Sequence, residues 1–259
     1  MLLKGWFNMD PFSRTSLLLG RDAIGKLSTK RVAVFGAGGV GGYAIEALAR
    51  SGVGSIDIID GDTVCISNIN RQLVALHSTI GSYKADLYAL RVLDINPGIH
   101  VCAHKFFFSL DTCMAFDFSS YDYVIDAIDS IEEKILLIKT CKDAGAPIIS
   151  SMGAAGKLDP SAFKCVDIYS TKVCPMAKTV RQRLRKIGIE SLKSVYSEEE
   201  VVRSPTAGMV EGCCCCTWTA QCGKSGDSAN GRHPMGSSIF APAGAGLLLA
   251  REVIGGLLG

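Results

Sequence analysis

Residues 31–42 read RVAVFGAGGVGG, and this stretch decides the fold. The β-branched, apolar run Arg31–Phe35 predicts a buried strand that stops at Gly36. Apolar residues then recur at helical spacing: Val40, Ala44, Ala47 and Leu48. The stretch therefore predicts a strand, a glycine turn and a helix.

The same alternation continues along the chain. Further strands are predicted at residues 55–60, 101–108, 123–127 and 147–151, with helices at 83–95 and 131–144. Strands that alternate with helices form a parallel sheet covered on both faces. The fold class predicted is therefore α/β, with a Rossmann-like, open, mostly parallel sheet and helices on both faces.

The pattern loosens after residue 151. We predict a strand at 164–168, a basic helix at 177–187, a flexible Cys-rich loop at about 204–238 and a C-terminal helix. We expect one domain over 1–259, comprising an N-terminal arm and helix (1–30), a nucleotide-binding half (31–151) and a substrate-side half (152–259). The apolar run 239–258 is interrupted by Pro242, Arg251 and Glu252, which favours a buried helix over a membrane span.

Composition sets outer limits on function. The 259 residues carry a formal net charge of +2, so contact with a polyanion requires a local basic patch. The first residues contain no apolar run of signal-peptide length, which predicts a cytoplasmic protein. Six of the eleven cysteines are scattered singly through predicted core elements, so reduced thiols are expected.

The glycine turn has the GxGxxG pattern in its strand-to-helix context. Glycines here, Gly36, Gly38, Gly39 and Gly41 among them, allow a tight turn and let backbone N–H groups and the helix start approach a phosphate. Asp60 ends the next predicted strand, where an acidic residue accepts a hydrogen bond from a ribose hydroxyl. Taken alone, these features are also typical of a nicotinamide-dependent oxidoreductase.

The residues after Asp60 favour a triphosphate. Residues 60–72 read DGDTVCISNINRQ, so Arg71 comes soon after the ribose position, and Lys84 follows. Fixed cations stabilise the charge that builds on a pyrophosphate leaving group. Asp129, near the end of another strand, could hold Mg²⁺ together with phosphate oxygens and water. For Arg71 or Asp129 considered alone, a surface ion pair or a turn is about as good an explanation.

At this point the chain resembles the ubiquitin-activating-enzyme-like superfamily that includes ThiF and MoeB. The shared motifs are the glycine loop, residues 60–72, Lys84 and the DAID segment at 126–129. The resemblance implies an adenylating fold, and the residues that it implies for ATP binding are Asp60, Asp62, Asn68, Arg71, Gln72, Lys84 and Asp129. It assigns Asp60 to the ribose, Asn68, Arg71 and Lys84 to phosphates, and Asp129 to the metal.

The resemblance also extends to a partner subunit. An arginine in a short N-terminal segment of these enzymes reaches the partner's ATP, and Arg14, in residues 12–15 (FSRT), resembles it. A homodimer in which Arg14 acts together with Arg71, Lys84 and Asp129 is implied.

The second half indicates the branch of the superfamily. ThiF and MoeB relatives carry two CxxC pairs that hold zinc, and this chain lacks that arrangement, so zinc is not expected. Residues 153–160 (GAAGKLDP), 167–171 (DIYST) and 174–178 (CPMAK) resemble the tRNA threonylcarbamoyladenosine dehydratase branch. That branch implies ATP-dependent cyclisation of threonylcarbamoyladenosine in a tRNA anticodon loop through an acyl-adenylate.

A tRNA substrate requires a cationic surface. Residues 172–193 hold seven Lys or Arg and one acid, Glu190, and the candidates for tRNA contact are Arg181, Arg183, Arg185 and Lys186. The alternative is a solvated amphipathic helix whose charges serve solubility. Residues 213–216, all cysteine, with Cys222 could bind a metal, form a redox pair or accept sulfur, or could belong to a variable loop without catalytic duty.

The sequence alone leaves other functions open. The alternatives are adenylation of the C-terminal Gly-Gly of a ubiquitin-like sulfur carrier, a NAD-dependent oxidoreductase and a scaffold without enzymatic activity. A sulfur-transfer partner protein and a bound monovalent cation are further possibilities that the residues leave open.

Overall fold

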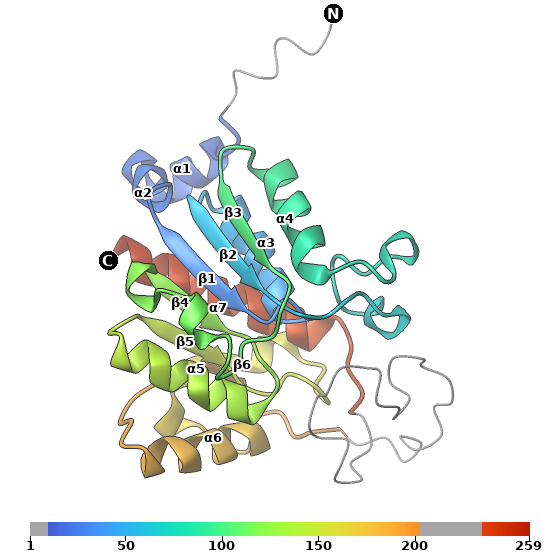
Figure 1. Cartoon of the computed structure of the whole chain (residues 1–259), viewed down its shortest axis with the longest axis vertical. Coiled ribbons are helices and arrows are strands. Elements are labelled where there is room, and N and C mark those ends of the chain that lie inside the picture. The colour runs from blue at the N-terminus through green and yellow to red at the C-terminus, as the bar shows by residue number, and fades with distance from the viewer. Residues whose placement is uncertain (1–9, 203–234) are drawn as a thin grey trace, which may run out of the picture.

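The computed structural model describes residues 10–202 and 235–259 (Figure 1). Its centre is a seven-stranded sheet of order β3-β2-β1-β4-β5-β7-β6, in which β6 pairs antiparallel with β7 and every other pairing is parallel. The strands are β1 Arg31–Phe35, β2 Ser55–Ile59, β3 His100–His104, β4 Tyr123–Asp126, β5 Ile148–Ser151, β6 Phe163–Asp167 and β7 Lys193–Ser197. The mostly parallel α/β fold class predicted from the sequence is confirmed.

Helices cover both faces of this sheet. They are α1 Ser13–Leu19, α2 Arg21–Leu27, α3 Gly41–Arg50, α4 Lys84–Ile95, α5 Ile131–Asp143, α6 Pro175–Lys186 and α7 Phe240–Leu258. One hydrophobic core joins α3, α4 and α7 to one face, and a second joins α5, α6 and an aromatic cluster to the other. Parallel sheets are buried in this way because their crossover helices lie on both faces.

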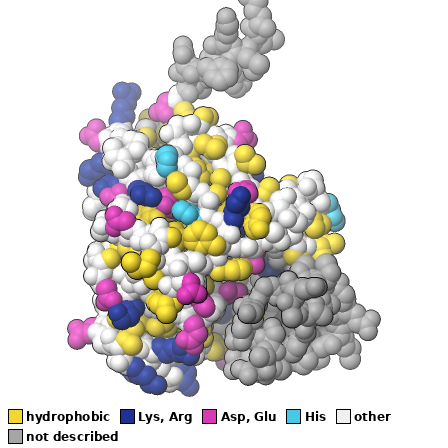
Figure 2. All heavy atoms as spheres, viewed as in Figure 1, with side chains coloured by type: hydrophobic (Ala, Val, Ile, Leu, Met, Phe, Trp, Pro, Cys, Tyr) yellow, Lys and Arg dark blue, Asp and Glu magenta, His cyan; other side chains and the backbone are white. Residues whose placement is uncertain are grey.

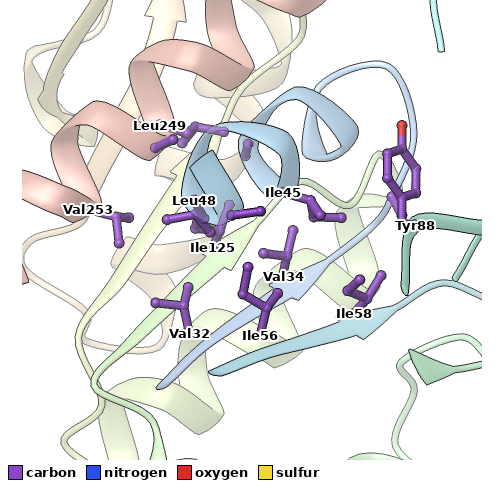
Figure 3. Packing of buried hydrophobic residues seen from close by; sticks show 14 of the residues in the cluster. Val32, Val34, Ile45, Leu48, Ile56, Ile58, Tyr88, Ile125, Leu249 and Val253 are labelled. Carbon is purple, nitrogen blue, oxygen red and sulfur yellow. The ribbon is translucent and has the colours of Figure 1, made fainter. Parts of the chain in front are cut away.

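The core around α3 shows why β1 is apolar along its length. Val32 and Val34 point to α3, while Ala33 and Phe35 point to the opposite core. Ile45 and Leu48 of α3 lie over these strands, and Leu249 and Val253 of α7 pack beside them (Figure 3). The two core faces therefore fix the direction in which α3, and the glycine turn before it, leaves the sheet.

The observed strands differ from the predicted ones in two places. The strand predicted at 101–108 ends at His104, because Phe106 and Phe108 pack under the sheet edge as part of a loop. Strand β7 was not predicted, because KSVYS is short and mixes polar with apolar residues; it is nevertheless buried from Ser194 to Ser197 between β5 and β6.

Strands from both predicted halves of the chain enter one sheet, since β7 pairs with β5. The division into an arm and two halves remains a prediction. The Cys-rich loop predicted at about 204–238 lies outside the described residues up to position 234, and so do residues 213–216 and Cys222.

Helix α7 is the one helix in the described parts of the chain that is long and apolar enough to cross a membrane. Core helices of soluble proteins meet the same criterion. Ala245, Leu249 and Val253 are fully buried against α3 and the sheet, so this helix completes the core.

Candidate nucleotide-binding site

The carboxyl ends of β1, β2 and β4 meet at one edge of the sheet. Phe35 lies opposite both Ile59 and Asp126 in the strand registers. The backbone N–H of Gly36 donates to the Ile59 carbonyl at 2.8 Å, and that of Ala127 donates to the Phe35 carbonyl at 2.8 Å. The glycine loop, the segment after Asp60 and the DAID segment are therefore neighbours, at the edge where open α/β sheets bind ligands.

The glycine loop leaves no room for side chains on its inner side. Gly36 has φ +89°, and a Cβ there would lie 2.6 Å from the Ala127 carbonyl oxygen; a Cβ at Gly41 would lie 1.8 Å from the Gly36 carbonyl oxygen. A Cβ at Gly38 would meet only Gln72, at 3.8 Å. The turn is thus closed toward the protein and open at Gly38, just before the N–H groups of α3 that can bind an anion.

Asp60 joins the glycine loop, by hydrogen bonds, to the segment that follows β2. Its buried carboxylate accepts from the N–H of Ala37 at 2.7 Å and from the N–H of Asp62 at 2.8 Å, one bond to each oxygen. Burial raises the pKa of Asp60, against the opposing effect of Lys84. Each carboxylate oxygen retains a second lone pair, which can accept from a ribose hydroxyl.

Lys84 is the buried cation of the site. It begins α4, and its Nζ lies 2.8 Å from the exposed carboxylate of Asp62. The lysine side chain is buried and the aspartate side chain is exposed, so this ion pair joins the protein interior to the surface.

The segment that joins β2 to α4 carries the remaining polar residues. Asn68 is buried, and its Oδ1 accepts from the Cys65 N–H at 3.1 Å. Arg71 donates to the Ser67 carbonyl at 2.7 Å and to Asn70 Oδ1 at 2.8 Å. Gln72 is buried beside Gly38, and within the described residues its Oε1 has no hydrogen-bond partner. An orphaned acceptor beside an anion-binding turn is suited to a ligand that brings a donor.

The two aspartates of the DAID segment have different environments. Asp126 is fully buried and accepts from Lys134 Nζ at 2.8 Å, from Ser150 Oγ at 2.5 Å and from the Ile128 N–H at 3.1 Å. Asp129 is exposed, just before α5. Asp126 is therefore a structural anchor for the segment, and Asp129 is the carboxylate that can meet a ligand.

A metal at this edge would need ligands from outside the protein. Among residues 10–202 and 235–259, no three His, Cys, Asp or Glu side chains come together in a group that could hold an ion. Mg²⁺ commonly takes one or two carboxylates and completes its shell with phosphate oxygens and water. Asp129 fits such a shared site.

Arg14 lies far from the site of its own chain. It is exposed on α1, and the ring of neighbouring Phe12 contacts Gly52, which follows the C-terminal end of α3. The glycine loop is at the other end of this ten-residue helix, a distance of about 15 Å along its axis. The structure therefore does not bring Arg14 together with the other predicted site residues of the same chain.

The basic residues of α6 divide into two groups. Arg181 Nη1 donates to the Thr171 carbonyl at 2.8 Å, so this side chain holds the preceding turn. Arg183 pairs with Glu132, the Arg185 guanidinium lies 5.2 Å from the centroid of the Tyr169 ring, and Lys186 is exposed. Lys and Arg side chains gather over α6 at the lower end of the molecule (Figure 2).

A buried polar network lies beneath the site and was not predicted from the sequence. Lys134 and Ser150 belong to α5 and β5, and together with Asp126 they form a fully buried polar cluster. The available signal was Lys134 itself, a lysine on the apolar side of a predicted helix.

Comparison with known proteins decides the family. A model of the ThiF family matches residues 12–230. The chain belongs to the ThiF family. This ThiF-family chain is 43% identical over 253 residues to the tRNA threonylcarbamoyladenosine dehydratase of Bacillus subtilis (strain 168), covering 95% of this chain and 94% of that protein. It is 36% identical over 231 residues to the enzyme of that name from Escherichia coli (strain K12), covering 85% of this chain and 84% of that protein.

Solved structures agree with this assignment to the ThiF family. The crystal structure of the E. coli tRNA N6-threonylcarbamoyladenosine dehydratase in complex with AMP superposes with a TM-score of 0.81 at 29% identity, covering 99% of this chain and 96% of that chain. The complex of the same enzyme with ATP gives a TM-score of 0.80. The resemblance inferred from the motifs is confirmed.

Proposed function

We propose that this chain is an ATP-dependent tRNA threonylcarbamoyladenosine dehydratase. The observation that carries the proposal is the convergence, at one sheet edge, of an anion-binding glycine loop, the ribose-type carboxylate Asp60 and the cation Lys84. The similarity to dehydratases over 95% of the chain supports the choice of substrate.

In this proposal ATP binds with its ribose at Asp60 and its phosphates at the glycine loop. The α3 N–H groups favour anions, so they hold the phosphate chain. Lys84, paired with Asp62 in the structure, turns its ammonium to the phosphates, and Arg71 supplies a second cation. Asp129 would hold Mg²⁺, which neutralises phosphate charge.

The reaction proceeds in two steps. A carboxylate oxygen of the threonylcarbamoyl group attacks the α-phosphorus and pyrophosphate leaves, forming the acyl-adenylate. The neighbouring carbamoyl group then closes a ring on the activated carbonyl, releasing AMP and a proton. The protein needs no nucleophile of its own, because activation and proximity supply the driving force. Arg71 and Lys84 act in the first step, where charge builds on the leaving group.

The direct test is mass spectrometry of the nucleoside. Protein is incubated with ATP, Mg²⁺ and tRNA bearing threonylcarbamoyladenosine, and loss of one water from that nucleoside is expected. The Arg71→Ala variant is the control. Equal conversion by both proteins, or none by either, would reject the proposal, and ATP–pyrophosphate exchange that requires a peptide ending in Gly-Gly would instead indicate the carrier-protein function.

The tRNA surface in this proposal is the exposed side of α6. Arg183, Arg185 and Lys186 provide positive charge, whereas Arg181 is excluded because it holds the turn at Thr171. Replacing Arg185 and Lys186 by glutamine should weaken tRNA binding and flatten its salt dependence, because fewer counterions are released. The measurement is filter binding across salt concentrations, with ATP affinity as the control.

Arg14 completes a site in trans. Its distance from its own glycine loop and the exposed leucines of α1, Leu17 (84% exposed) and Leu18 (83%), support a homodimer. A groove lined by Leu19, Leu247 and other residues of α3 and α7 lies beside them.

The test of this arrangement is complementation. Arg14→Ala and Arg71→Ala are each expected to be inactive, whereas an equal mixture, refolded or co-expressed, should recover about a quarter of wild-type activity, because half the dimers are mixed and one of their two sites is intact. No recovery would contradict action in trans. A cytoplasmic location, a monovalent cation and a sulfur-transfer partner stay predictions.

A further inference from the structure

Three consecutive phenylalanines follow β3 and cross the carboxyl ends of β2 and β1. Phe108 is buried, and its ring centroid lies 5.1 Å from that of Phe35. Phe106 packs against Phe116 on the same side, at 5.9 Å. Phe107, between these two buried or partly buried rings, is 54% exposed. The segment thus places one aromatic ring on the solvent side of the edge where the nucleotide is expected.

The position of Phe107 is fixed by close packing on Gly61. A Cβ added at Gly61 would lie 2.9 Å from Cδ2 of Phe107 and 2.9 Å from its backbone nitrogen. The Phe107 carbonyl accepts from Thr112 Oγ1 at 2.9 Å, which holds the following turn. Any side chain at position 61 would displace the ring, so the glycine and the phenylalanine fit each other.

Gly61 lies between the two aspartates of the site. Asp60 precedes it and is held by the glycine loop, and Asp62 follows it and pairs with Lys84. The ring of Phe107 therefore packs on the residue that directly follows the aspartate expected to bind the ribose. The nearest cation on this loop, Lys105, is paired with Asp86 at 3.3 Å and lies over the Tyr83 ring, so its charge is already engaged away from Phe107.

We propose that the Phe107 ring forms one wall of the adenosine pocket and contacts the base or the ribose of ATP. The inference rests on the proposed function only in taking ATP as the nucleotide. Aromatic side chains stack on nucleobases. Substitution of Phe107 by alanine should therefore weaken nucleotide binding by the contribution of one stacked ring. A ring held on Gly61 loses little freedom when the nucleotide binds.

The test is calorimetric titration of the full chain with ATP, AMP and inorganic tripolyphosphate. Phe107→Ala should raise the dissociation constants for ATP and AMP about 5- to 30-fold and leave that for tripolyphosphate unchanged. Phe107→Tyr should bind ATP as the wild type does. Met114→Ala is the matched control, because Met114 is 89% exposed in the same β3–β4 connection. Thermal melting without nucleotide, measured for every variant, monitors the fold.

The outcomes separate the two proposals. Unchanged ATP affinity in Phe107→Ala would overturn the pocket assignment, and so would an equal loss of tripolyphosphate affinity, which would mean that the ring supports the phosphate site structurally. If Phe107→Ala is unstable, Phe107→Leu is used, with an intermediate loss expected. Failure of the wild type to bind ATP would reject the proposed function, whereas ATP binding without tRNA dehydration leaves the role of Phe107 supported.

Discussion

Replacing Lys134 by methionine tests the buried cluster beneath the nucleotide site. Lys134 Nζ contacts Asp126 at 2.8 Å, the Ser151 carbonyl at 2.9 Å and Ser150 Oγ at 3.3 Å, and both charged side chains are fully buried. The variant keeps an unbranched side chain only one atom shorter than lysine and removes the charge. Asp126 is then left as a buried carboxylate without a cation.

The magnitude follows from the partners that remain. Removing one partner of a buried ion pair costs about 3–5 kcal/mol. Asp126 keeps its bonds from Ser150 Oγ at 2.5 Å and from the Ile128 N–H at 3.1 Å, which places the expected loss of unfolding free energy near the lower value, about 3 kcal/mol. In a domain of this size that loss lowers Tm by about 6–12 °C.

The assay is urea unfolding followed by circular dichroism at pH 7, read as a shift of the midpoint at constant m. Lys139→Met is the matched control, because Lys139 belongs to the same helix, is 53% exposed and pairs with Asp143 only at the surface. It should cost less than about 0.5 kcal/mol. If Lys134→Met is no more destabilising than Lys139→Met, the cluster does not anchor β4.

Three further variants test the core and the glycine loop. Burial alone would raise the pKa of Asp57, but contacts from His104, Arg31 and Tyr121 outweigh it and hold the pKa at about 2. Because the pKa of Asp57 is depressed in the folded state, its contribution to stability is complete above the unfolded pKa and is lost as the pH falls. Asp57→Asn should therefore lower the unfolding free energy by roughly 2 kcal/mol at pH 7. The difference in unfolding free energy between this variant and the wild type, measured in urea, should narrow by about 1 kcal/mol by pH 3. Gly41→Ala should abolish ATP binding in calorimetry, since its Cβ would lie 1.8 Å from a loop carbonyl, whereas Gly255→Ala, in open space on α7, should not. Tyr88→Phe should change the unfolding free energy by less than about 0.5 kcal/mol or raise it, because the hydroxyl removed is buried without a partner among the described residues, and a larger loss would reveal an unseen partner.

The sequence was sufficient for the part of the molecule in which local pattern and tertiary environment agree. Strand β1 is buried on both faces and is apolar throughout, so Arg31–Phe35 could be predicted to its ends. The glycine loop could be predicted because Gly36 and Gly41 are required by backbone geometry within a few residues. The place of Asp60 in the site could be predicted from its separation from that loop along the sequence, and the structure confirms that Asp60 and the loop are in contact.

Features that depend on distant partners could not be predicted. Strand β7 is buried only because β5 and β6 flank it, and its own residues give no clear alternation. The different roles of Asp126 and Asp129 depend on Lys134, which comes from the next helix. Arg181 could not be told apart from its basic neighbours until Thr171 was seen beside it.

The packing of α7 has a consequence for how the protein is made. Leu249 and Val253 are buried against α3, the helix that begins at the glycine loop, and α7 is synthesised after α3 and after all seven strands of the described sheet. During translation the first strands can form while one side of α3 is still uncovered and exposed to other apolar chains. The nucleotide loop thus gains its full support only after synthesis of α7, and the apolar side of α3 stays uncovered until that helix has formed.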